Sequence, residues 1–290
     1  MTPIANNNLS PLPFYTSISE QNHRRSYAYG NIYPLYGQTS LLLPFQLMRE
    51  HRTNAITLVE IYTKDGVFVR DMRSMMQNAG LSVVSYESYG IDVIKFPARF
   101  VMATQLEEGQ YYLKMSDGIE TWYSDILTLI DDLSPYTCIE WYDTQDLIYS
   151  AGIINYQDGY RNRLYFVNEI GKPEYEFEEE GESRDGYFFA EKQVSTKTYK
   201  CNVLAPEYLV DAMRIIRLSD VVNVRDKYGR SYHCYTFLIT PTWQTQGDLA
   251  SVEIEFTTDT VVKALGRGYI IPNYGDFNDD FNDDYNNEEE

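Results

Sequence analysis

The stretch from Val194 to Leu265 constrains the fold of this chain more than any other. One amphipathic segment stands there between runs rich in Val, Thr, Tyr and Phe. Its apolar residues recur at the 3.6-residue spacing of a helix with one buried face: Leu209, Ala212, Met213 and Ile216. Pro206 suits the first helical position because the N–H that proline lacks would be unpaired there. We therefore predict a helix over residues 206–218.

The runs on either side of this helix have the period of strands. Val252, Ile254 and Phe256 alternate with polar residues, and the segment around Phe237 alternates more loosely. Alternation of this kind is typical of a sheet with one face buried and the other exposed to solvent. The simplest assembly is an antiparallel sheet that carries one packed helix.

The rest of the chain also reads as short strands separated by turns. Asp65-Gly66 and Asp117-Gly118 each stand between two strand-like runs, as in tight hairpins. The 290 residues include 27 Tyr, a residue that favours half-buried pleated surfaces and interfaces. We predict a mainly β protein with two antiparallel β-sandwich-like domains, over residues 31–133 and 134–266, of which the second contains the helix.

The two ends of the chain lack this periodicity. Residues 1–30 mix Pro, Asn and Tyr and predict an extended arm, either disordered alone or ordered on a neighbouring subunit through Phe14 and Tyr15. Residues 267–290 predict an acidic flexible tail with a short repeat, FNDD-FNDD-YNNE. This tail could instead dock on a partner through Phe277, Phe281 and Tyr285, or hold calcium, although its spacing does not match a calcium-binding loop.

Charge and cysteine content narrow the function. The net charge of −19 argues against specific nucleic-acid binding, which needs a surplus of Lys and Arg. Three cysteines without CxxC spacing predict reduced thiols in a protein made in the cytoplasm. The first residues lack the pattern of a signal peptide, and no apolar run is long enough to span a membrane.

No motif for catalysis or for a cofactor is visible. The chain has three histidines, and His233 and Cys234 are adjacent, so in a strand their side chains point to opposite faces. The acidic run at residues 174–182 is more typical of a solvated edge strand than of a metal site. Paired carboxylates like those of glycosidases and aromatic platforms for sugars both stay open, because they depend on tertiary structure. We predict no enzyme activity, no cofactor and no metal.

Two passages resemble virion proteins of Bacteroides phages, including the crAss-like group. The first joins EEGQYYLKMSDGIETWYSDILTLIDD to YTCIEWYDTQDL, and the second runs from LAPEYLVDAMRIIRLSD through TFLITPTWQTQGDLASVEIEFTTDTVVK. The similarity spans most of residues 35–265. The order strand, helix, strands is also similar to the modules of tail tube, distal tail and tail hub proteins.

This resemblance implies a structural subunit of a tailed-phage virion, assembled in the host cytoplasm. It implies a ring-forming tail hub or connector, with sixfold or twelvefold symmetry, that contacts other tail and neck proteins. An acidic body would repel DNA that passes through the lumen of such a ring. The alternative is a glycan-binding module of the tail that attaches to the host, and a phage-encoded hydrolase is the third possibility.

Overall fold

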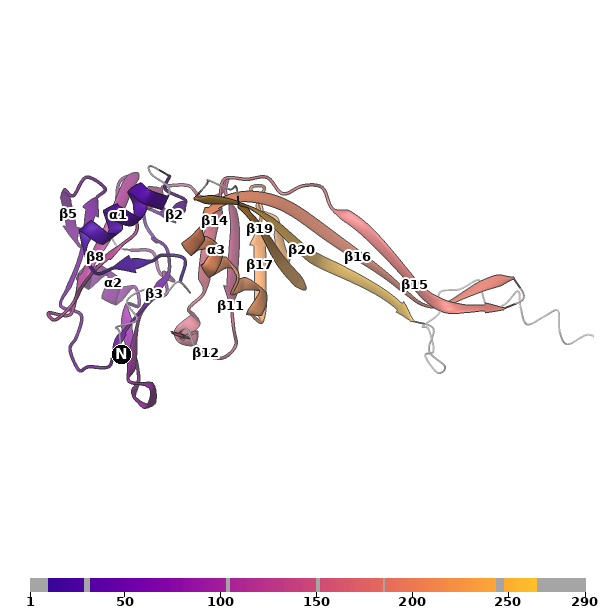
Figure 1. Cartoon of the computed structure of the whole chain (residues 1–290), viewed down its shortest axis with the longest axis horizontal. Helices are drawn as coiled ribbons and strands as arrows, with labels where there is room; N and C mark the ends of the chain where they lie inside the picture. Colours follow the sequence, from indigo (N-terminus) through magenta and orange to yellow (C-terminus); the bar gives the residue numbers. More distant parts are fainter. Residues whose placement is uncertain are drawn as a thin grey trace, which may run out of the picture. The chain divides into compact units, whose positions relative to one another are not determined.

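The computed structural model describes residues 10–28, 32–102, 105–149, 152–184, 186–243 and 248–264. The protein is mainly β, with several antiparallel sheets (Figure 1). The described residues divide into two compact units. Of the described residues, the larger unit holds those up to Glu174 together with Lys197–Asp259, and the smaller holds Tyr175–Thr196 and residues 260–264.

The first sheet of the larger unit has seven strands. Five lie in the order β1-β9-β8-β10-β2, and β4 joins β8 and carries β5. Its strands are β1 (Phe14–Tyr15), β2 (Leu35–Gln38), β4 (Leu58–Thr63), β5 (Phe68–Asp71), β8 (Gly109–Ser116), β9 (Thr121–Ser124) and β10 (Leu127–Ile130). The hairpins β4–β5 and β8–β9 turn at Gly66 and Gly118, whose φ values of 83° and 87° confirm the predicted Asp-Gly turns. One pairing departs from the antiparallel prediction, because β10 runs parallel to β2.

The second sheet has the order β3-β7-β6, with β3 (Phe45–Glu50), β7 (Ile91–Phe96) and β6 (Ser82–Tyr86). Phe45 packs against Phe14 of the first sheet, with ring centroids 5.0 Å apart, and against Phe96, at 5.6 Å. The helix α2 (Arg73–Asn78) follows β5 in the chain and buries Met76, and a 3₁₀ turn, η1 (Glu87–Tyr89), leads into β7. The two sheets therefore share one aromatic and aliphatic core.

The strands after residue 133 build separate sheets. The third sheet has the order β14-β11-β17-β18, with β11 (Thr137–Tyr142), β14 (Asn162–Phe166), β17 (Val221–Arg225) and β18 (Ser231–His233). A ribbon of β12 (Leu147–Tyr149) and β13 (Gly152–Ile154), followed by the 3₁₀ turn η2 (Gln157–Gly159), lies between β11 and β14 in the chain. Among the described residues, no strand before residue 133 pairs with one after it.

The fourth sheet has the order β15-β16-β20-β19, with β15 (Glu174–Arg184), β16 (Tyr187–Pro206), β19 (Thr236–Trp243) and β20 (Leu249–Ala264). Its Phe256 ring contacts Tyr232 of the third sheet, with centroids 6.0 Å apart. The predicted alternation in β20 is confirmed, because Val252, Ile254 and Phe256 are all fully buried. The acidic run is the edge strand β15, as predicted.

The predicted helix is present but shorter than its apolar period. The helix α3 covers Glu207–Met213, with Pro206 one position before it, and a 3₁₀ turn, η3 (Ile216–Leu218), completes the segment. The four residues of the predicted apolar stripe are all buried: Leu209, Ala212, Met213 and Ile216. The amphipathic period thus identified the buried face correctly, although the backbone changes to a 3₁₀ turn.

The prediction of an extended N-terminal arm is wrong for residues 14–28. Phe14 and Tyr15 form β1, which pairs with β9, and the helix α1 (Ile18–Ala28) follows. The helix begins with a reciprocal cap, because the Ser17 hydroxyl accepts a hydrogen bond from the Glu20 N–H and the Glu20 carboxylate accepts one from the Thr16 N–H. This Ser-x-x-Glu start and the strand partner β9 are what order the segment.

Candidate functional site

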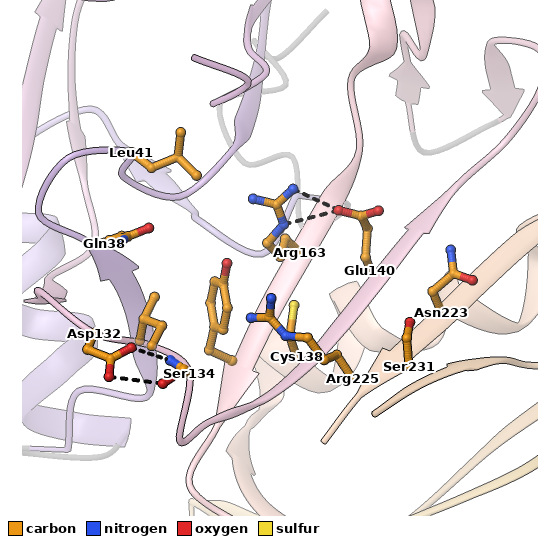
Figure 2. Close-up of a pocket in the computed structure, with 12 residues that line it drawn as sticks. Gln38, Leu41, Asp132, Ser134, Cys138, Glu140, Arg163, Asn223, Arg225 and Ser231 are labelled. Atoms are coloured by element: carbon orange, nitrogen blue, oxygen red, sulfur yellow. Dashed lines mark hydrogen bonds and ion pairs between the residues drawn. The ribbon is translucent and has the colours of Figure 1, made fainter. Parts of the chain in front are cut away.

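A polar groove of about 480 Å³ lies against the third sheet (Figure 2). The strands β11, β14, β17 and β18 form its floor, and the chain around β2 and the end of β10 contributes its other wall. Its lining residues are Gln38, Leu41, Asp132, Leu133, Ser134, Cys138, Glu140, Arg163, Tyr165, Asn223, Arg225 and Ser231. We call this feature the polar groove.

The strand register explains why these side chains gather on one face. Cys138 lies opposite both Tyr165 and Arg225, and Arg225 lies opposite Ser231, which makes one row across the sheet. Glu140 forms the next row with Arg163 on one side and Asn223 on the other. Because side chains alternate along a strand, the intervening residues point into the core. Ile139, Trp141 and Val224 are accordingly buried.

An ion-pair cluster occupies one end of the groove. Arg163 donates two hydrogen bonds to the Glu140 carboxylate, of which the shorter is 2.7 Å, and Arg161 donates another at 2.8 Å. Burial alone would raise the pKa of Glu140, but the hydrogen bonds from the two guanidinium groups outweigh it and hold that pKa below its ordinary value. The Arg161 guanidinium also lies 4.5 Å from the centre of the Tyr142 ring. Glu140 is therefore a satisfied carboxylate and not a free base.

Arg225 is the exception in the groove. Its side chain is exposed, and it has no hydrogen bond or ion pair with any residue that the structure describes. Asp132, the other acid of the groove, accepts hydrogen bonds from the N–H and the hydroxyl of Ser134, at 2.8 and 2.9 Å. Figure 2 shows Arg225 beside the Cys138 sulfur, apart from both acid clusters. Within the described part of the chain, Arg225 is thus the one cation lining the groove that is available to bind an anion.

The cysteines are not activated. All three are free and buried. Burial raises the pKa of the Cys138 and Cys201 thiols to about 11 and that of Cys234 to about 12. A nucleophilic cysteine needs a depressed pKa and a nearby base. These thiols are packing groups.

A second cluster of charged residues was not predicted from the sequence. Arg49 donates hydrogen bonds to Asp92 at 3.1 Å and to Asp117 at 2.7 Å, and all three residues are buried. His51 contacts the other oxygen of Asp92 at 2.7 Å, and Arg52 reaches Asp117 at 2.7 Å. The sequence signals for this cluster were the basic run Arg49, His51 and Arg52 and the Asp117-Gly118 turn. These two segments are distant along the chain, so their proximity could not be predicted.

This cluster adjoins a hollow of about 550 Å³ lined in part by His51, Ser82 and Ser85. An imidazole held by a carboxylate is half of a hydrolytic triad, but here Asp92 is shared with Arg49. Burial alone would raise the pKa of Asp92. Hydrogen bonds with His51, Ser85, the Arg52 backbone and Arg49 outweigh burial, so this pKa is lower than its ordinary value. We interpret the cluster as a buried clamp between β3, β7 and the turn at Asp117.

The predicted partner-binding residues lie in different settings. Phe14 and Tyr15 are buried in the core of their own chain, so the prediction that they anchor on a neighbour needs correction. The cause is the pairing of β1 with β9, which makes this segment a strand of the first sheet, with the Phe14 ring packed against Phe45. Phe277, Phe281 and Tyr285 lie outside the described residues.

No known family model matches the chain, and no curated protein is significantly similar to it. Within the described residues, no group of three or more His, Cys, Asp and Glu side chains could hold a metal ion. The helices described in the structure are all too short or too polar to cross a membrane.

Proposed function

We propose that this chain is a structural subunit of a tailed-phage virion that assembles with copies of itself into a ring, as a tail hub or tail connector. It acts by filling a place in the assembly and not by catalysis. The resemblance of its two long passages to virion proteins suggests the class. A surface in the smaller unit supports self-assembly on physical grounds.

The observation that carries this proposal is the hairpin of residues 175–196, formed by β15 and the first part of β16. Tyr175, Phe177 and Tyr187 are 59%, 75% and 71% exposed on it. A two-stranded ribbon is marginally stable in water, and large exposed aromatic side chains gain free energy when a partner surface covers them. Covering each ring would contribute about 2 kcal/mol of hydrophobic free energy. A neighbouring subunit would supply that cover.

The charge of the hairpin fits a position near a DNA channel. β15 carries six glutamates between Glu174 and Glu182, and the whole chain has a net charge of −19. A surface with this charge repels the phosphate backbone, so DNA could pass without being held. The same charges deter uncontrolled pairing of the exposed β15 edge.

Sedimentation velocity of the purified chain over a wide concentration range tests the proposal. We expect a discrete oligomer, visible as rings by electron microscopy, and we expect mass spectrometry to detect the chain in purified phage particles. A chain that stays monomeric at every concentration and is absent from particles would overturn the proposal.

One observation favours a glycan-binding module as the second candidate. A hollow of about 340 Å³ is lined in part by Tyr33, Tyr36 and Asn202. Aromatic rings beside an amide are suited to stack on and orient a sugar. Saturable binding on a glycan array that is lost in Tyr33→Ala and Tyr36→Ala variants would favour this candidate over the structural one.

A further inference from the structure

We infer that the polar groove binds a glutamate side chain from strand β15 of a second copy of this chain. This inference rests on the proposed self-assembly and names the contact that would join neighbouring subunits. It depends on two complementary features, an arginine and two glutamates that have no ion-pair partner among the described residues.

The first surface of the contact is the polar groove, where Arg225 would bind the glutamate. The Arg225 guanidinium is exposed in a groove that also presents the Ser231 hydroxyl, whereas the Ser134 hydroxyl already donates its proton to Asp132. Guanidinium groups bind carboxylates through two parallel hydrogen bonds, and hydroxyls can donate to the remaining lone pairs. The two acids of the groove do not compete, because Glu140 is paired with Arg161 and Arg163 and Asp132 is held by Ser134. A carboxylate is therefore the ligand that would complete the site.

The second surface of the contact is the face of β15 that carries alternate glutamates. Along this face, Glu174 pairs with Lys200 at 2.9 Å and Glu180 pairs with Lys192 at 3.5 Å. Glu176 and Glu178, between them, are exposed and have no ion-pair partner among the residues described. Residues two apart on a strand are about 7 Å apart, so the two carboxylates present a pair of charges on one side.

A second copy is a better occupant than a free anion. Among the described residues, Arg225 is the one cation lining the groove that has no ion-pair partner, and it is matched by carboxylates that also lack one on an edge strand of the same sequence. An isolated phosphate or citrate ion would find only one free guanidinium there, which gives weak binding in water. The contact is head-to-tail, because groove and strand are different surfaces, and repetition of such a contact can close a ring.

Charge reversal tests the contact on the full chain. Arg225→Glu makes the groove repel its ligand, and Glu176→Lys with Glu178→Lys makes the strand repel the groove. We expect each variant to raise the dissociation constant for self-association by at least about tenfold. These side chains are exposed and have no ion-pair partner among the described residues, so the far-UV circular dichroism and the Tm should stay at wild-type values at a concentration where the wild-type chain is also dissociated. Glu107→Lys, an exposed change of the same sign elsewhere, is the matched control and should assemble normally.

Restoring complementarity makes the test specific. A chain with all three substitutions should assemble again, since its lysine strand meets a glutamate groove. An equimolar mixture of the two defective variants should also assemble, with alternating subunits, although neither does so alone. Sedimentation velocity measures both results.

The outcomes separate this inference from the proposed function. If the wild-type chain does not self-associate, the proposed function and the inference both fail. If the wild type assembles and either charge-reversed variant assembles equally well, only the inference fails. Loss of assembly in both variants without recovery in the mixture or in the triple variant would also overturn the inference, because the two surfaces would then not face one another.

Discussion

Replacing Arg49 with methionine should destabilise the larger unit strongly. The Arg49 side chain is 1% exposed, and those of its partners Asp92 and Asp117 are both 0% exposed. Removal of one member of a buried ion pair costs about 3–5 kcal/mol because a buried charge is left without its partner. Asp92 would keep its contact with His51, and Asp117 would keep Arg52, so the lower end of this range applies. We expect a loss of about 3 kcal/mol in the free energy of unfolding at pH 7.

Urea unfolding followed by far-UV circular dichroism measures this loss, as a fall of about 1 M in the midpoint. Lys227→Met, which removes a surface pair with Glu169, should change the free energy by less than about 0.5 kcal/mol. The folded-state pKa values of Asp92 and Asp117 are lowered, so the stabilisation by these carboxylates is present above their unfolded pKa of about 4. It is lost as the pH falls through the folded values, and the difference between wild type and variant should narrow below about pH 4. An Arg49→Met protein as stable as the wild type at pH 7 would refute the reasoning.

Three further predictions concern the core, a turn and the thiols. Ile254→Ala removes a fully buried side chain and should lower the free energy of unfolding by about 2–5 kcal/mol, as measured by chemical denaturation. Val261→Ala on the same strand, where the side chain is 67% exposed, should lower it by less than about 0.5 kcal/mol. Equal losses would contradict the burial pattern of β20. Gly118→Ala should lower the stability to urea by about 1 kcal/mol, because φ is 87° there, and a gain would show that the turn relaxes. The three buried thiols should react with iodoacetamide at pH 8 only after the chain unfolds, because burial also raises their pKa, to about 11 for Cys138. Mass spectrometry counts the labelled cysteines. Rapid labelling of the folded chain would disprove their burial.

Local patterns predicted the parts of the fold that depend on local physics. The Asp-Gly turns at Gly66 and Gly118 require positive φ wherever they occur, and the alternation around Ile254 identifies a buried face without reference to any partner strand. The segment of Phe14 and Tyr15 carries no such information. Its strand partner lies in β9, and only that pairing turns a Pro- and Asn-rich terminus into part of the core.

The candidate site could not be predicted for the same reason. The polar groove brings Gln38, Cys138 and Arg225 together from distant parts of the chain, and the register that aligns Cys138 with Arg225 is a tertiary property. The His51–Asp92 contact is likewise invisible in a sequence without a motif around either residue. What the sequence could reveal was the acidic alternation of β15, which needs only the period of a strand.

The pairing of the earliest strands with much later ones has a consequence for biosynthesis. Among the described strands, β1 pairs with β9 and β2 pairs with β10, where Phe14 lies opposite Ser124 and Leu35 lies beside Leu127. On the ribosome, the first apolar residues to emerge therefore stay unpaired and exposed until most of the first two sheets has been translated. During that interval Leu12, Phe14 and Leu35 are open to chaperones, and a pause in translation before β9 would prolong their exposure.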